Sequence, residues 1–315
     1  MKYKKTVILL TIALIFLGGA GYFLFKHKAV DNAKPEVFNA DTAMLAIFGT
    51  YNDQHKGVLL PEQTTQNWDV AQADTMATAL FTATYTEAGR KMAVLALQRQ
   101  QMFEGVVEES HATAAVISVY VFAFNGQQWV FEKGKKEVTE AGAHGNAPGG
   151  KLIRLGQDRY GLLFKGGDIH QGYTNDYAFV ISLSDPKPAK VLELDMGESN
   201  SGTCSEDQKE QEESGLQACW ERVAKLSFLQ QNPADAYFVL QLTTTSNEKT
   251  SDQPDSSKVE KTGDKYFVRT ANGYKLSRDP GLKSASIVSD ELVNNAGETV
   301  FHKTGAASSA KKEGK

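Results

Sequence analysis

Short runs rich in β-branched and aromatic residues, separated by turn residues, recur along most of this 315-residue chain. The clearest is TAAVISVYVFAFNGQQWVFE at 113–132, where Asn125-Gly126 suits the positive φ angles of a type I′ turn between two strands. A second Asn-Gly pair at 272–273 predicts another hairpin. Because such connections are too short for a crossover helix, neighbouring strands should pair antiparallel.

The remaining runs extend this pattern and predict a mainly β fold. They lie at 79–86, 91–98, 151–155, 159–165, 176–184, 190–195, 223–230 and 236–245. We expect an antiparallel meander of about a dozen short strands, arranged as a sandwich or as propeller-like blades. The stretch AMLAIFGTY that follows Asp41 fits either a helix capped by Asp41 or a buried strand, because short apolar runs do not distinguish the two.

An uncharged apolar segment of twenty residues, Thr6 to Phe25, precedes these runs. At about 1.5 Å per residue a helix of this length spans roughly 30 Å, the thickness of a bilayer core. The segment therefore predicts one N-terminal transmembrane helix. Its flanking lysines favour a cytoplasmic N-terminus, since three precede the segment and two follow it.

A cleaved signal peptide is the alternative for this segment, because Gly18, Gly19 and Ala20 offer a small-residue cleavage site. The apolar run continues through Tyr22 to Phe25 beyond that site, which favours the anchor. We expect a single-pass inner-membrane protein with its main domain outside the cytoplasm, or a secreted protein if cleavage occurs. Under both interpretations, the rest of the chain is exported.

The domain organisation follows from these segments. Residues 1–28 form a cytoplasmic tip and the anchor, 29–40 a short stalk, and 41–302 an exported β-rich domain. Within that domain, 246–264 is polar and predicts a mobile loop. Residues 303–315 predict a disordered tail.

Cys204 and Cys219 are the only cysteines of the chain. Outside the cytoplasm thiols meet an oxidising environment, so an even count of two predicts one intramolecular disulfide. The stretch between them contains no histidine and no CxxC spacing, which argues against a metal or redox site. Six carboxylates lie between Glu206 and Glu221, either as a solvated surface or as a negative patch for a basic partner.

The charge balance limits the partners of the exported part. Without the five lysines that flank the apolar segment, 29 of the 34 basic residues remain against 38 acidic ones. Nucleic-acid binding requires clustered Lys and Arg to neutralise phosphates, so no nucleic acid is expected. An anionic membrane surface is disfavoured for the same reason.

The stretch KGGDIHQGYTNDY at 165–177 is the strongest candidate for a binding site. Three glycines, Gly166, Gly167 and Gly172, would permit a tight loop. Its candidate residues are Asp168, His170, Tyr173, Asn175 and Asp176. Such a loop would suit Ca²⁺ or a His–Asp acid/base pair. The same residue types also occur in turns for their geometry alone. The sequence therefore predicts no cofactor.

The motif content favours binding over catalysis. The chain contains no HExxH, GxSxG or P-loop signature, and His111 and His144 occur as lone histidines in polar stretches. We therefore expect a protein-binding domain of the cell envelope, such as a complex subunit, an inhibitor or an immunity factor. The alternative is an envelope hydrolase or metal-dependent enzyme that uses the 165–177 stretch.

Overall fold

The computed structural model describes residues 37–60, 74–247, 260–288 and 298–301. The chain divides into two compact units, Met1–Val37 and Phe38–Lys315, and every element below belongs to the second. The predicted anchor at Thr6 to Phe25, most of the predicted stalk and the predicted tail lie outside the described residues. Among the residues that the model does describe, no helix is long and apolar enough to cross a membrane.

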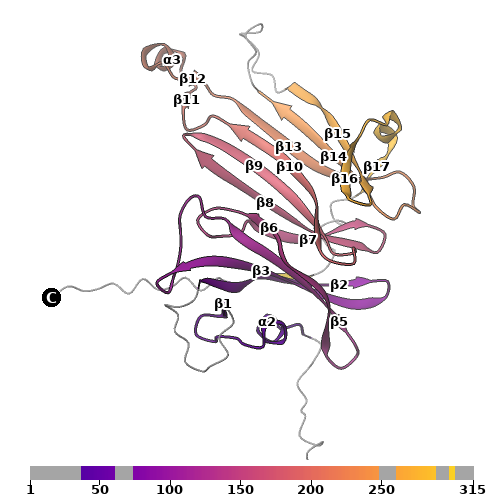
Figure 1. Ribbon diagram of the computed structural model, residues 1–315. Coiled ribbons are helices and arrows are strands. Elements are labelled where there is room, and N and C mark those ends of the chain that lie inside the picture. The colour runs from indigo at the N-terminus through magenta and orange to yellow at the C-terminus, as the bar shows by residue number, and fades with distance from the viewer. Residues whose placement is uncertain (1–36, 61–73, 248–259, 289–297, 302–315) are drawn as a thin grey trace, which may run out of the picture. The chain divides into compact units, whose positions relative to one another are not determined.

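The described chain is mainly β, as the sequence predicts, and its strands form two large sheets (Figure 1). The first sheet has the order β1-β2-β3-β5-β6, with β4 paired to β3 and β18 to β2. Its strands are β1 (Gly57–Leu60), β2 (Thr75–Glu87), β3 (Arg90–Phe103), β4 (Val106–Val107), β5 (Ala115–Phe124), β6 (Trp129–Ala141) and β18 (Glu298–Phe301).

The second sheet has the order β16-β15-β14-β13-β10-β9-β8-β7, with β17 paired to β13. Its strands are β7 (Gly149–Gly156), β8 (Arg159–His170), β9 (Tyr173–Ser182), β10 (Ala189–Ser199), β13 (Glu221–Gln230), β14 (Val239–Ser246), β15 (Glu260–Thr270), β16 (Gly273–Ser277) and β17 (Ser286–Ile287). A 3₁₀ helix, η2 (Pro280–Ser284), precedes β17. All pairs in both sheets are antiparallel, and most join strands that are consecutive in the chain.

A shared apolar core joins the two sheets. Phe81 of β2 lies 5.9 Å from Phe164 of β8, and Tyr85 lies 4.7 Å from Tyr160, between ring centroids. The buried cluster around these rings takes residues from β2, β3 and β5 on one side and from β7, β8 and β9 on the other. Burial of large aromatic side chains is strongly favourable, so this layer fixes one sheet on the other.

The second sheet also folds over on itself. β10 and β13 share only three register pairs, from Gly197↔Val223 to Ser199↔Glu221, next to a bulge between Asp195 and Gly197. A separate buried cluster then combines residues of β7 to β10 with residues of β13, β14 and β16. Bulges bend strands in this way. The end of the sheet beyond β10 therefore packs against the face that the first sheet leaves free.

The segment after Asp41 is a helix, which settles the alternative that the sequence leaves open. Helix α2 (Ala40–Phe48) is capped by Asn39, whose side chain accepts a hydrogen bond from the Thr42 backbone N–H, and not by Asp41. Asp41 instead accepts a 2.6 Å hydrogen bond from the Tyr51 hydroxyl. The buried side of α2 packs on the outer face of the first sheet, opposite the shared core.

Both predicted Asn-Gly hairpins exist, but neither is a type I′ turn centred on Asn-Gly. Phe124 pairs with Trp129 across a four-residue loop in which only Gly126 has a positive φ, and Thr270 pairs directly with Gly273. Two consecutive positive φ angles occur instead at Ala88-Gly89, Glu104-Gly105, His144-Gly145 and Gln171-Gly172. The strand register selects the central residues of each turn, and it overrides the local preference of Asn-Gly.

Several strands are longer than the sequence runs that predict them. β3 contains 14 residues and β2 contains 13, with a bulge between Ala79 and Phe81 that accommodates their twist. β15 begins at Glu260, inside the segment predicted as a mobile loop, whereas residues 248–259 lie outside the described residues.

Candidate functional site

The 165–177 stretch is a strand hairpin and not the tight loop that its glycines suggest. β8 continues to His170, the chain turns at Gln171-Gly172, and β9 begins at Tyr173. Gly166 and Gly167 lie within β8, opposite Tyr177 and Asp176. A Cβ at Gly166 would lie 2.7 Å from the Tyr177 ring, so the glycine accommodates a large neighbour across the strands.

The predicted site residues separate into two groups in this hairpin. Asp168 and Asp176 line a cavity of about 630 Å³, whereas His170, Tyr173 and Asn175 are exposed and do not line it. Among the described residues the His170 side chain has no hydrogen bond or ion pair, and the register partner of His170 is Tyr173. The His–Asp acid/base pair considered from the sequence therefore has no supporting geometry.

The opposite wall of this cavity is the disulfide loop, which the sequence treats as a separate feature. Cys204 and Cys219 are bonded, as predicted, with a Cα–Cα distance of 4.9 Å. Two short parallel strands, β11 (Cys204–Ser205) and β12 (Gln217–Ala218), lie beside the bond. They enclose a helix, α3 (Gln208–Ser214), which carries part of the acidic run.

Asn200 holds the disulfide loop against the sheet. Its side chain is fully buried, donates to the Ala218 carbonyl at 2.9 Å and accepts from the Trp220 backbone N–H at 2.8 Å. The Asn200 backbone N–H also donates to the Trp220 carbonyl. These bonds continue the β10–β13 ladder by one residue and fix Trp220 at the cavity.

The tip of the β8–β9 hairpin contacts the start of the same loop. The Gly202 N–H donates to the Gly172 carbonyl at 2.9 Å, and a Cβ on Gly202 would lie 2.6 Å from the Gly172 Cα. Neighbouring hydroxyls add a polar floor, since Thr174 and Ser199 oxygens are 2.7 Å apart and Ser199 donates to Ser201. The hairpin and the loop are therefore one assembled structure around the cavity.

The lining of this cavity is acidic and contains no basic side chain. Its residues are Gly167, Asp168, Ile169, Thr174, Asp176, Ser199, Ser201, Cys204, Glu206, Cys219, Trp220, Glu221 and Asn247. Within the described part of the chain, none of its four carboxylates forms an ion pair. Half-buried Trp220, exposed Ile169 and the disulfide supply apolar surface between them. We call this the acidic cavity.

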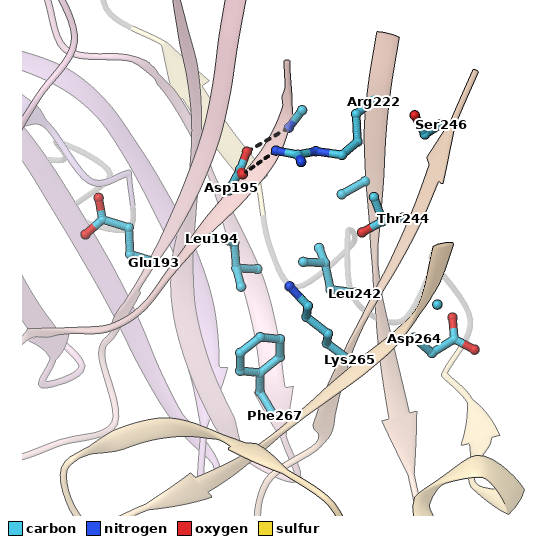
Figure 2. A pocket seen from close by; sticks show the side chains of 13 residues that line it. Glu193, Leu194, Asp195, Arg222, Leu242, Thr244, Ser246, Asp264, Lys265 and Phe267 are labelled. Atoms are coloured by element: carbon cyan, nitrogen blue, oxygen red, sulfur yellow. Dashed lines mark hydrogen bonds and ion pairs between the residues drawn. The ribbon is translucent and has the colours of Figure 1, made fainter. Parts of the chain in front are cut away.

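A second cavity, of about 570 Å³, lies where the second sheet folds over (Figure 2). Its apolar floor includes Leu194, Leu242 and Phe267. Arg222 at its rim contacts Asp195 at 3.1 Å and Glu198 at 3.0 Å, so these charges compensate one another. Charged groups that are already paired offer less to a charged ligand than the carboxylates of the acidic cavity, which form no ion pair among the described residues.

The 165–177 stretch does not provide a set of metal ligands. Across the residues that the model describes, no three His, Cys, Asp or Glu side chains come together in a way that would hold a metal ion. The four carboxylates of the acidic cavity are thus spread along its lining. This arrangement suits an extended cationic group better than a point ion such as Ca²⁺, which needs six to eight close oxygens.

The comparisons with known proteins returned no match: no family model, no curated protein and no solved structure matches this chain.

Proposed function

We propose that this chain is a non-enzymatic binding domain that takes a basic segment of a partner protein into the acidic cavity. One observation carries the proposal: four acidic residues, with no basic residue among them, contribute to the lining of a hollow that also presents a tryptophan and an isoleucine. Arginine and lysine side chains combine a cationic head with an apolar stem, and guanidinium groups stack on indole rings. The lining thus complements both parts of such a side chain.

The proposed setting is the cell envelope, with the domain tethered by Thr6 to Phe25 outside the cytoplasm. The disulfide supports export, because such bonds persist in oxidising compartments. A complex subunit, an inhibitor or an immunity factor would each use a surface of this kind. In all three roles the partner is a protein, and the acidic cavity receives its basic residues.

The proposal is tested by titrating the full chain with a capped peptide that contains two arginines, using calorimetry. The matched peptide has glutamine in place of both arginines. The site variant is Asp176→Asn/Glu221→Gln, and the control is Glu140→Gln/Asp158→Asn, which removes the same charge from exposed residues outside the cavity lining.

Loss of two exposed ion pairs, at about 0.2–1 kcal/mol each, should weaken arginine-peptide binding roughly two- to thirtyfold in the site variant alone. Added salt should weaken it further in the wild-type chain. Equal affinity for both peptides, or equal losses in the site and control variants, would contradict the proposal. Comparable binding of spermidine would show a general polycation site and would also count against a protein partner.

A further inference from the structure

Two histidines that stand alone in the sequence meet in the fold. His111 lies between β4 and β5, and His144 lies between β6 and β7, 33 positions further along the chain. Their ring centroids are 3.9 Å apart. Both residues are exposed, and in the described part of the chain their ring nitrogens have no hydrogen bond or ion pair. The imidazole nitrogens are therefore available to a ligand.

The two loops that carry these histidines are fastened to each other through the backbone. The Gly145 N–H donates to the Thr113 carbonyl at 2.7 Å, and a Cβ on Gly145 would lie 2.7 Å from the Glu108 carbonyl oxygen. Thr113 in turn donates to the Ser110 carbonyl, which closes the turn around His111. The proximity of the rings is thus imposed by the fold and does not depend on the rings themselves.

His144 is also held in an uncommon backbone conformation. Its φ is +54°, and its carbonyl accepts a 2.9 Å hydrogen bond from the Asn146 side chain. Asn146 accepts from Gln100 of β3, so the turn is tied to the first sheet. The positive φ belongs to the two-residue turn His144-Gly145, which the hydrogen bond from the Asn146 N–H to the Ala143 carbonyl closes.

We propose that His111 and His144 form a two-imidazole site for a divalent late transition metal, with water completing the coordination. Imidazole is a preferred ligand of Cu²⁺, Ni²⁺ and Zn²⁺, and Cu²⁺ binds nitrogen ligands most tightly of these. Exposed side chains on fixed loops can turn their nitrogens toward one ion without moving the backbone. The site is distant in sequence from the acidic cavity and independent of the function proposed for it.

The test is a Cu²⁺ titration of the full, metal-free chain, followed by electron paramagnetic resonance. The variants are His111→Asn and His144→Asn, because asparagine also tolerates the left-handed conformation of residue 144 and keeps the loop folded. His55→Ala is the control, since it removes one histidine from a turn where only the residue's backbone N–H is hydrogen-bonded.

One equivalent of Cu²⁺ should bind with hyperfine coupling to two nitrogens. Loss of either histidine should lower the affinity for Cu²⁺ at least about tenfold. Loss of a residue that only supports a metal ligand already costs roughly that much, and a direct ligand should cost no less. Each variant should then show coupling to one nitrogen, while His55→Ala should match the wild-type chain. Unchanged affinity and spectrum in His144→Asn, with an unchanged melting temperature, would overturn the site.

Discussion

At the residue scale, Asn200 is the side chain on which the acidic cavity most depends. Its two side-chain hydrogen bonds reach both ends of the Ala218–Trp220 segment, and it is completely buried. Asn200→Ala should lower the free energy of unfolding by about 1–3 kcal/mol, because buried partners would be left without hydrogen bonds. Urea denaturation measures this.

Asn272→Ala is the matched control for Asn200. Asn272 is an exposed asparagine in a hairpin loop and should change stability by less than about 0.5 kcal/mol. Equal losses in the two variants would show that Asn200 does not hold the loop.

Tyr85 gives the structure a dependence on alkaline pH. Burial, and next the nearby Glu87 carboxylate, raises the pKa of Tyr85 above its ordinary value. The folded state then holds the phenol proton more tightly than the unfolded state, which loses it near pH 10. The free energy of unfolding that this tighter proton binding contributes is fully present below about pH 10, and it declines as the pH rises above that value.

Tyr85→Phe should reduce that decline, measured as the urea midpoint between pH 8 and 11. It should not cost stability at neutral pH, because the Tyr85 hydroxyl is buried without a hydrogen-bond partner among the described residues. Tyr173→Phe, at an exposed tyrosine, is the control. A variant that declines as steeply as the wild-type chain would show that another group dominates.

Part of the candidate site was predictable from residue types alone. The glycine-rich stretch predicts Asp168 and Asp176 as site residues, and both contribute to the lining of the acidic cavity. The count of two cysteines predicts the Cys204–Cys219 disulfide, which the structure confirms. Trp220 carried no local signal, since its role depends on a contact between β9 and a loop some thirty residues further along the chain. His170 is exposed and lies outside the lining of the acidic cavity, a separation that only the pairing of the strands reveals.

At the element scale, the hairpin tip and the disulfide loop should behave as one unit. Gly172 occupies the second position of a type I′ turn, and a Cβ there would also lie 2.9 Å from the Gly202 backbone carbon. Gly89 occupies the same position of another type I′ turn with nothing within 4 Å. An alanine at Gly89 therefore tests backbone strain alone, whereas an alanine at Gly172 tests the same strain together with the contact to Gly202.

Gly89→Ala should destabilise the fold by about 1–2 kcal/mol, the cost of a left-handed conformation for a residue with a Cβ. Gly172→Ala should cost clearly more and should weaken arginine-peptide binding as well. Thermal unfolding and calorimetry measure the two effects. Equal destabilisation in both variants would indicate that the hairpin tip does not pack on Gly202.

The errors in the predicted elements share a physical cause. Asn-Gly prefers type I′ turns in isolation, yet pairing of the long strands decides which residues become central, as at Ala88-Gly89. Likewise, Gly166 and Gly167 signalled a loop, whereas they serve close packing against cross-strand neighbours. Local preferences predicted that hairpins occur and did not predict their turns.

At the scale of the whole molecule, the sequence indicated antiparallel strands but left open how the sheets pack. Alternating patterns identify strands, whereas the pairing of Phe81 with Phe164 or the fold of β10 against β13 depends on contacts between distant segments. The acidic cavity lies at a junction of this kind, between β8, β9 and β10 and the loop that follows. Local patterns therefore indicated some of its residues but not the cavity as a whole.

The disulfide contributes to the stability of the whole β-rich domain. Closure of a loop with a sequence separation of 15 should stabilise the fold by about 3 kcal/mol. Cys204→Ser, Cys219→Ser and the double variant should all lose this amount, because each removes the same bond. Denaturant unfolding with and without reductant measures it, and a reductant-insensitive wild-type chain would contradict the prediction.

Photo-crosslinking in cells that produce the chain tests most directly whether the acidic cavity receives a basic segment of a protein partner. A photoreactive residue replaces Ile169, which lines the cavity and is 68% exposed. We expect one discrete adduct whose crosslinked peptide contains arginine or lysine, and a lower yield of that adduct when Asp176→Asn/Glu221→Gln is added. An adduct whose yield is unchanged when both carboxylates are neutralised, or no adduct at Ile169 in cells that hold the chain at its native level, would contradict the proposal.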